Sequence, residues 1–141
     1  MCLIVVANLC SILFKQTADK SYEKLRQAIF SNRLLLVHGG KLTQEYRVAG
    51  VLKVIALLSQ SGKAFRVSDK LIEAQLLKIK GRCTSNDEHV IALARADRQR
   101  AHLLCTDDEA LRIDFKNKAL IDNPRGTIYS PTRHKQSLAN C

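Results

Sequence analysis

The sequence lacks the cysteine spacing of zinc sites and disulfide frameworks, and it lacks an apolar run long enough to cross a membrane. Its five cysteines, at positions 2, 10, 83, 105 and 141, include no C-x-x-C pair, and the histidines are not clustered. Cys2, Cys10 and Cys105 lie in apolar runs, where a free cysteine behaves as a small buried hydrophobic residue. The first apolar run is interrupted by Asn8 and Ser11 and is shorter than the roughly 20 residues of a spanning helix. We therefore expect reduced thiols, a cytoplasmic location and no membrane partner.

Acidic residues are also scarce. The 13 acids face 23 lysines and arginines, and the resulting net charge of +10 is spread along the chain from Lys15 to Lys135. Such a surface attracts polyanions, of which nucleic acid is the usual one, because neutralising phosphates releases counterions. A basic surface kept for solubility or for an acidic protein partner is the alternative.

With 141 residues, of which 46% are hydrophobic, the chain is long enough for one core. We expect one domain over residues 1–130 and a polar, basic tail over 131–141. The sequence from Asn123 onward contains both prolines and could pack along the domain, remain mobile, or touch RNA or a partner. The sequence as a whole leaves open whether the chain forms a homodimer.

The pattern of apolar residues predicts strands alternating with helices. Continuous apolar runs indicate buried strands, and helical spacing indicates amphipathic helices. Strands are predicted over 2–7, 33–38, 64–67 and 102–106, and helices over 21–32, 42–59, 69–80, 87–96 and 107–115. This order with short connections predicts an α/β fold with a parallel sheet covered by helices on both faces.

Ligands of such sheets bind beyond the carboxyl ends of the strands, where polar residues follow apolar runs. Acidic residues stand at suitable places: Glu45 early in a helix, Asp87 at a helix start, and Asp107 with Asp108 at a strand end. Carboxylates that hold a divalent cation could support phosphodiester hydrolysis. Taken singly, each acid is equally explained as a helix cap, a first-turn acid or a solvated side chain.

Two segments resemble consecutive motifs of the PIN-domain family of ribonucleases. SNDEHVIALARA is similar to a third motif of the form D-x-H-[VI]-[IL]-A-L-A, and HLLCTDDEAL to a fourth motif, T-x-D-x-x-L. GGKLTQEYR resembles the second motif and places its glutamate at Glu45. The first motif ends in D-[AT]-N, and here Val6 stands at the aspartate position, before Ala7 and Asn8.

The resemblance implies a three-layer α/β/α sandwich with a mainly parallel sheet and an endoribonuclease activity that uses Mg²⁺ or Mn²⁺. It also implies a toxin neutralised by an antitoxin protein. Asp87 and Asp108 would be direct metal ligands, and Glu45 a direct or water-mediated one. Asn8, Thr106 and Asp107 would support them.

Val6 departs from the family pattern, because valine has no lone pair for a cation, and metal binding should therefore be weakened. Val6 is either an inactivating change in a toxic ribonuclease or a feature of a homologue that kept the fold for RNA binding or protein interaction without catalysis. His38, His89 and His102 are interpreted as structural or surface residues. Basic residues that could contact RNA phosphates, or simply form solvated helix faces, are Lys41, Arg47, Arg95, Arg98 and Arg100.

Overall fold

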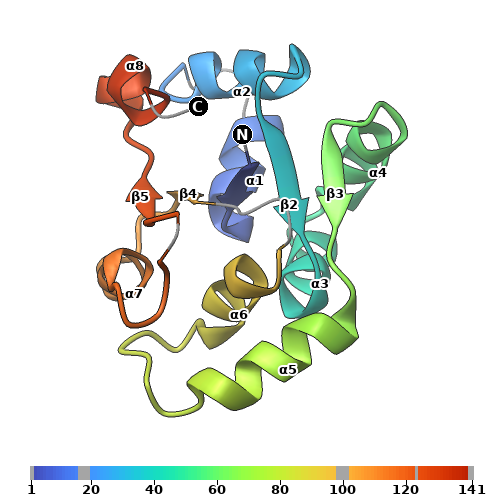
Figure 1. Ribbon diagram of the computed structural model, residues 1–141. Helices are drawn as coiled ribbons and strands as arrows, with labels where there is room; N and C mark the ends of the chain where they lie inside the picture. The colour runs from blue at the N-terminus through green and yellow to red at the C-terminus, as the bar shows by residue number, and fades with distance from the viewer. Residues whose placement is uncertain (1, 16–19, 98–101, 123, 140–141) are drawn as a thin grey trace.

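The computed structural model describes residues 2–15, 20–97, 102–122 and 124–139, and it contains a five-stranded parallel sheet flanked by helices (Figure 1). The strands follow the order β3-β2-β1-β4-β5. They are β1 (Cys2–Val5), β2 (Leu35–His38), β3 (Ala64–Arg66), β4 (Leu103–Cys105) and β5 (Thr127–Ile128). The predicted α/β fold with its parallel central sheet is therefore confirmed, in the arrangement of a three-layer α/β/α sandwich.

The helices that precede β5 connect successive strands, as parallel pairing requires. They are α1 (Ala7–Phe14), α2 (Glu23–Phe30), α3 (Gly40–Val48), α4 (Leu52–Gln60), α5 (Asp69–Ile79), α6 (Glu88–Ala96) and α7 (Glu109–Lys116). The 3₁₀ turn η1 (Pro131–Arg133) and helix α8 (His134–Ser137) follow β5. Within the described ranges, none of them is both long and apolar enough to span a membrane.

The central strand β1 is buried over its whole length, which explains its continuous apolar sequence. It pairs with β2 on one side and with β4 on the other. The strand ends at Val5, two residues earlier than predicted, because the chain turns into α1 at Ala7. Val6 keeps an extended backbone, and its amide donates to the carbonyl of Cys105 at 3.1 Å. The first residue after β1 is thereby fixed beside the end of β4.

The predicted single helix over 42–59 is wrong, since two helices occupy this region. Helix α3 ends at Val48 and α4 begins at Leu52. Gly50 lies between them with a φ of 76°, a left-handed conformation that glycine adopts without a steric penalty. The break lets α3 lie at the carboxyl ends of the strands while α4 leads back to β3.

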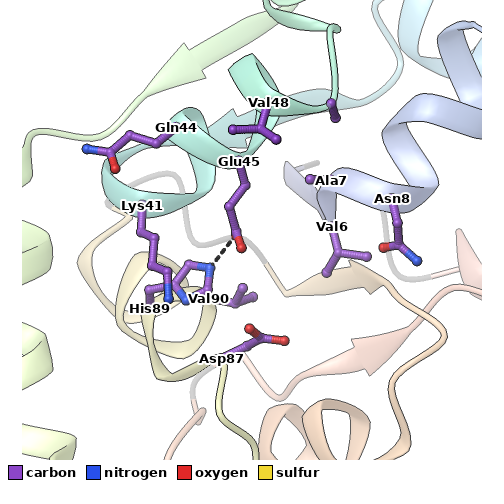
Figure 2. A pocket seen from close by; sticks show the side chains of 11 residues that line it. Val6, Ala7, Asn8, Lys41, Gln44, Glu45, Val48, Asp87, His89 and Val90 are labelled. Atoms are coloured by element: carbon purple, nitrogen blue, oxygen red, sulfur yellow. Dashed lines mark hydrogen bonds and ion pairs between the residues drawn. The ribbon is translucent and has the colours of Figure 1, made fainter.

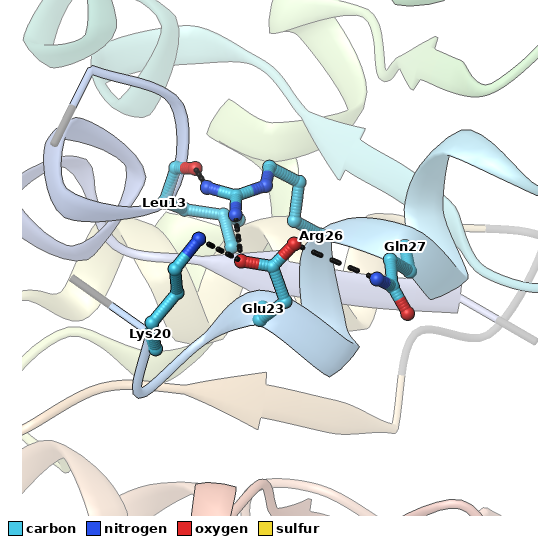
Figure 3. Close-up of polar contacts among 5 residues, drawn as sticks. All are labelled: Leu13, Lys20, Glu23, Arg26 and Gln27. Carbon is cyan, nitrogen blue, oxygen red and sulfur yellow. Dashed lines mark hydrogen bonds and ion pairs between the residues drawn. The ribbon is translucent and has the colours of Figure 1, made fainter. Parts of the chain in front are cut away.

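Helices α1 and α2 are joined by a polar cluster at the end of α1 (Figure 3). The guanidinium of Arg26 donates to the carbonyl of Leu13 at 3.1 Å and to the carboxylate of Glu23 at 2.5 Å. Lys20 adds a contact to the same carboxylate at 3.4 Å. The side chain of Arg26 is only 14% exposed, so this pair is shielded from solvent more than most surface ion pairs.

The C-terminal segment packs against the rest of the chain. Leu138 is buried in the core, and the hydroxyl of Tyr129 lies 2.8 Å from Nδ1 of His134. The backbone amide of Ser130 donates to the hydroxyl of Ser137 at 3.0 Å. Of the arrangements that the sequence leaves open for this segment, the structure shows packing along the domain up to residue 139.

His38 closes β2 in a buried environment. Its Nδ1 lies 2.8 Å from the hydroxyl oxygen of Thr43, whereas Nε2 is buried and has no hydrogen-bond partner among the described residues. Burial, reinforced by the positive charge of Arg66, lowers the pKa of His38 to about 4. The ring is therefore neutral at physiological pH, as expected for a structural histidine.

We expect His38 to make the folded state less stable as the pH falls from about 6.5 to about 4. In this window the unfolded chain binds a proton at His38 and the folded chain does not, so protonation favours unfolding. Urea denaturation of the wild type and of His38→Phe at pH 7.5, 6, 5 and 4 measures this effect. The stability difference between the two proteins should shrink or change sign toward pH 4, and a pH-independent difference would contradict the buried, neutral state.

Candidate metal centre

A pocket of about 560 Å³ lies where β1, β2 and β4 end, between the start of α1, helix α3 and the start of α6 (Figure 2). This is the edge of a parallel sheet at which ligands generally bind. The lining residues are Val6, Ala7, Asn8, Lys41, Gln44, Glu45, Val48, Ala49, Asp87, His89 and Val90.

Glu45 enters the pocket from α3, which is anchored by the residue that follows it. Tyr46 is fully buried, and its hydroxyl donates to the carbonyl of Val5 at 2.5 Å. Burial raises the pKa of Tyr46 well above its usual value, so the phenol keeps the proton that this hydrogen bond needs. Because Tyr46 fixes the rotation of α3 against the end of β1, Glu45 is held beside Val6.

Asp87 is the residue before α6, and His89 lies in the first turn of that helix. His89 is 7% exposed, and its Nε2 lies 2.7 Å from Oε1 of Glu45. Asp87 faces the same space from below in the view of Figure 2. Helix α6 is buried from His89 to Ala94, so its position relative to the sheet is fixed by the core.

The ligand atoms of Glu45, Asp87 and His89 all lie within 4.8 Å of one another. Protein ligands sit about 2.0–2.6 Å from a divalent ion, so atoms that share one ion are separated by no more than about 5 Å. The three side chains therefore form a group that could hold a metal ion. The contact between His89 and Glu45 is equally a good hydrogen bond without a metal.

Asp108, the other predicted direct ligand, lies outside this group within the described residues. Its Oδ1 accepts a hydrogen bond from the amide of Leu111 at 3.2 Å and so caps α7. Its own amide donates to the hydroxyl of Thr106 at 3.1 Å. In this structure Thr106 and Asp108 thus shape the start of α7.

Asp107 and Asn8 connect the two strand ends. The side-chain amide of Asn8 lies 3.3 Å from each carboxylate oxygen of Asp107. Asn8 also lines the pocket, whereas Asp107 is not part of the metal group among the described residues. The supporting roles of Asn8 and Asp107 stay predictions.

His89 is the site residue that the sequence interpretation misses, because the sequence favours a structural or surface role for it. The signal was present in the D-x-H spacing at the start of α6, where both polar residues can turn toward the strand ends. Nothing in the sequence alone showed that Glu45 would approach the ring.

The basic residues predicted to contact RNA fall into different environments. Lys41 is exposed and lines the pocket, and Arg47 is exposed on α3. Arg95 is engaged in the fold instead, because its guanidinium donates to the side chain of Gln75 at 2.9 Å and to the carbonyl of Leu120 at 2.8 Å. Arg98 and Arg100 lie outside the described residues.

The cysteines near the strand ends are buried, as predicted. Burial raises the pKa of the Cys105 thiol to about 12 and that of Cys10 higher still. A thiol must ionise to act as a nucleophile. Cys105 and Cys10 therefore do not offer an alternative catalytic group at this edge of the sheet.

Comparisons of the chain with models of protein families, with curated proteins and with solved structures find no match. The similarity to PIN domains therefore rests on the sequence motifs, and the site is assigned from its own chemistry.

Proposed function

We propose that the protein is a metal-dependent endoribonuclease with a PIN-like active site whose metal binding is weakened by Val6. The observation that carries this proposal is the convergence of Glu45, Asp87 and His89 at the carboxyl edge of a parallel sheet. The motif resemblance further suggests a cytoplasmic toxin with an antitoxin protein as partner.

The donor set favours Mn²⁺ over Mg²⁺. Mg²⁺ prefers oxygen ligands, whereas Mn²⁺ also accepts an imidazole nitrogen, and this group combines two carboxylates with one histidine. For His89 to act as a ligand, Nε2 must present its lone pair, so the ring proton must sit on Nδ1. When bound, the ion would neutralise phosphate charge and supply a nucleophilic water at neutral pH.

RNA is the substrate class that best fits the rest of the surface. The net charge of +10 attracts a polyanion, and Lys41 places an ammonium group at the pocket where a phosphate would approach (Figure 2). Arg47 lies on the same helix. These contacts would position the backbone of RNA and would carry little information about its bases.

The alternative is a non-catalytic RNA-binding or protein-interaction module, and Val6 is the observation that favours it. Val6 makes an apolar wall where a fourth ligand, and a third carboxylate, could stand. A pocket with few charged ligands can bind RNA through Lys41 and still lack the metal needed for hydrolysis.

We expect Mn²⁺ to stabilise the wild-type protein against heat. A ligand that binds only the folded state at 100 times its Kd adds about 2.7 kcal/mol of stability. Thermal unfolding with increasing MnCl₂ should therefore show a rising Tm for the wild type and for Glu109→Gln, which alters an exposed acid outside the group. The shift should vanish in Asp87→Asn, and an equal shift in all three proteins would exclude this metal site.

Cleavage of labelled single-stranded RNA in Mn²⁺ tests the activity itself. Slow cleavage by the wild type should be abolished by Asp87→Asn and by Glu45→Gln, because both remove a carboxylate from the metal group. RNA binding, measured by fluorescence anisotropy, should persist in these variants. If the wild type binds RNA and does not cut it, the non-catalytic alternative holds.

A further inference from the structure

We propose that Asp114 is a positioning residue for the metal site, acting through Ser85 to keep the carboxylate of Asp87 free to face the pocket. This inference rests on the proposed function, because it concerns the same metal group. Asp114 lies on α7 and does not line the pocket.

Both oxygens of the Asp114 carboxylate accept hydrogen bonds from the same short backbone segment. It is 1% exposed; Oδ1 accepts from the amide of Thr84 at 2.9 Å, and Oδ2 accepts from the amide of Ser85 at 2.8 Å. Hydrogen bonds to an ionised acceptor are stronger than neutral ones, and two of them fix the orientation of the segment as well as its position. Thr84 and Ser85 are thereby held against α7 by Asp114, which lies 30 and 29 positions further along the chain, respectively.

Ser85 passes this restraint on to Asp87. Ser85 is 6% exposed, and its hydroxyl oxygen accepts a hydrogen bond from the amide of Asp87 at 3.0 Å. The backbone of Asp87 is therefore held by a buried network that begins on α7.

A comparison with other helix starts shows what this network achieves. Ser68 and Asp108 precede α5 and α7, and the side chain of each accepts a hydrogen bond from the amide three residues further on. Asp87 precedes α6 in the same position, yet its side chain makes no such capping bond. Its carboxylate instead lies within the group formed with Glu45 and His89.

An aspartate before a helix ordinarily turns back to cap it. The amide of Asp108 also donates to a nearby hydroxyl, that of Thr106. The feature peculiar to α6 is therefore the Asp114 carboxylate, which holds Ser85 and the backbone before Asp87. With its approach fixed in this way, the start of α6 does not depend on a cap from Asp87. The side chain of Asp87 can then point at a ligand. Groups that orient metal ligands in this way typically change metal affinity by about tenfold to a hundredfold when mutated.

The test measures Mn²⁺ affinity of the folded protein by electron paramagnetic resonance of free Mn²⁺, together with stability by urea denaturation. Asp114→Asn places an NH₂ group against one of the two backbone amide hydrogens and removes the negative charge, so it should weaken Mn²⁺ binding by about tenfold or more. Ser85→Ala should weaken it as well, and Ser85→Thr, which retains a hydroxyl acceptor, should restore it.

Glu23→Gln is the control, because Glu23 is also a carboxylate that accepts hydrogen bonds, from Arg26 and Lys20 in the α1–α2 cluster (Figure 3), and it does not line the pocket. It should lower stability and leave Mn²⁺ affinity unchanged. If Asp114→Asn and Ser85→Ala behave like Glu23→Gln, Asp114 is merely structural and the inference is overturned. Should Asp114→Asn fail to fold, the pair Ser85→Ala and Ser85→Thr decides. A wild type that binds no Mn²⁺ overturns the proposed function itself, which is a different result.

Discussion

Replacing Val6 by aspartate should tighten Mn²⁺ binding by about tenfold to a hundredfold and increase RNA cleavage by at least as much. Val6 lines the pocket together with Glu45 and Asp87, and its backbone is fixed by the hydrogen bond from its amide to Cys105. A carboxylate at this position adds both a ligand oxygen and a negative charge to the metal group. Isothermal titration with MnCl₂ and the RNA cleavage assay measure the two effects.

The same substitution should destabilise the metal-free protein. A third carboxylate beside Glu45 and Asp87 introduces repulsion of about 1 kcal/mol for each pair about 4 Å apart in water. We therefore expect Val6→Asp to have a lower Tm than the wild type without metal and a larger Tm increase with Mn²⁺. A general loss of packing would lower the Tm of Val6→Asp relative to the wild type by the same amount with and without Mn²⁺. A Tm difference that shrinks or changes sign when Mn²⁺ is added would therefore point to metal binding at position 6.

Two control variants separate coordination from charge. Val6→Asn offers an oxygen without a charge and should give a smaller gain than Val6→Asp. Val48→Asp adds the same carboxylate to a residue that lines the pocket but is 90% exposed, and it should bind Mn²⁺ no better than the wild type. If Val6→Asp gains no more than Val48→Asp, Val6 does not occupy a ligand position.

Much of the fold could be predicted because the pattern of apolar residues along the chain follows from which side chains are buried. The run at Cys2–Val5 is continuously apolar because both faces of β1 are covered. Ser68 indicated the start of α5, because serine is a preferred residue for capping the first turn of a helix. The short strand β5 could not be predicted. Its two residues, Thr127 and Ile128, are β-branched and suit a strand, but a pattern of two residues is too short to predict one, and they pair because β4 lies beside them.

The candidate site was only partly predictable, for a chemical reason. Helix caps and metal ligands both favour aspartate where a strand or loop leads into a helix. The sequence treats Asp87 and Asp108 alike, whereas in the structure Asp108 caps α7 and Asp87 leaves its helix uncapped. The amide of each aspartate donates to a hydroxyl two residues earlier, so what distinguishes Asp87 is the Asp114 carboxylate that holds the backbone of Thr84 and Ser85. This contact joins distant parts of the chain and leaves no local pattern.

Gly126→Ala should destabilise the fold strongly, by about 3 kcal/mol, because an added methyl group in a packed site forces the backbone to move. Gly126 is buried, and a Cβ atom there would collide with the carbonyl oxygen of Phe115 and lie 2.8 Å from Cδ1 of its ring. The obstacle is mainly backbone at the end of α7, so a change of side-chain rotamer cannot relieve it.

Gly62→Ala is the matched control for this prediction. Gly62 has a φ of 71° and nothing within 4 Å of an added Cβ, so alanine there should cost only about 1 kcal/mol for its left-handed backbone. Urea denaturation of both variants gives the comparison, and equal losses would show that Gly126 is not packed against α7. Since α7 also carries Asp108 and Asp114, a shift of this helix in Gly126→Ala should weaken Mn²⁺ binding too, whereas Gly62→Ala should leave it intact.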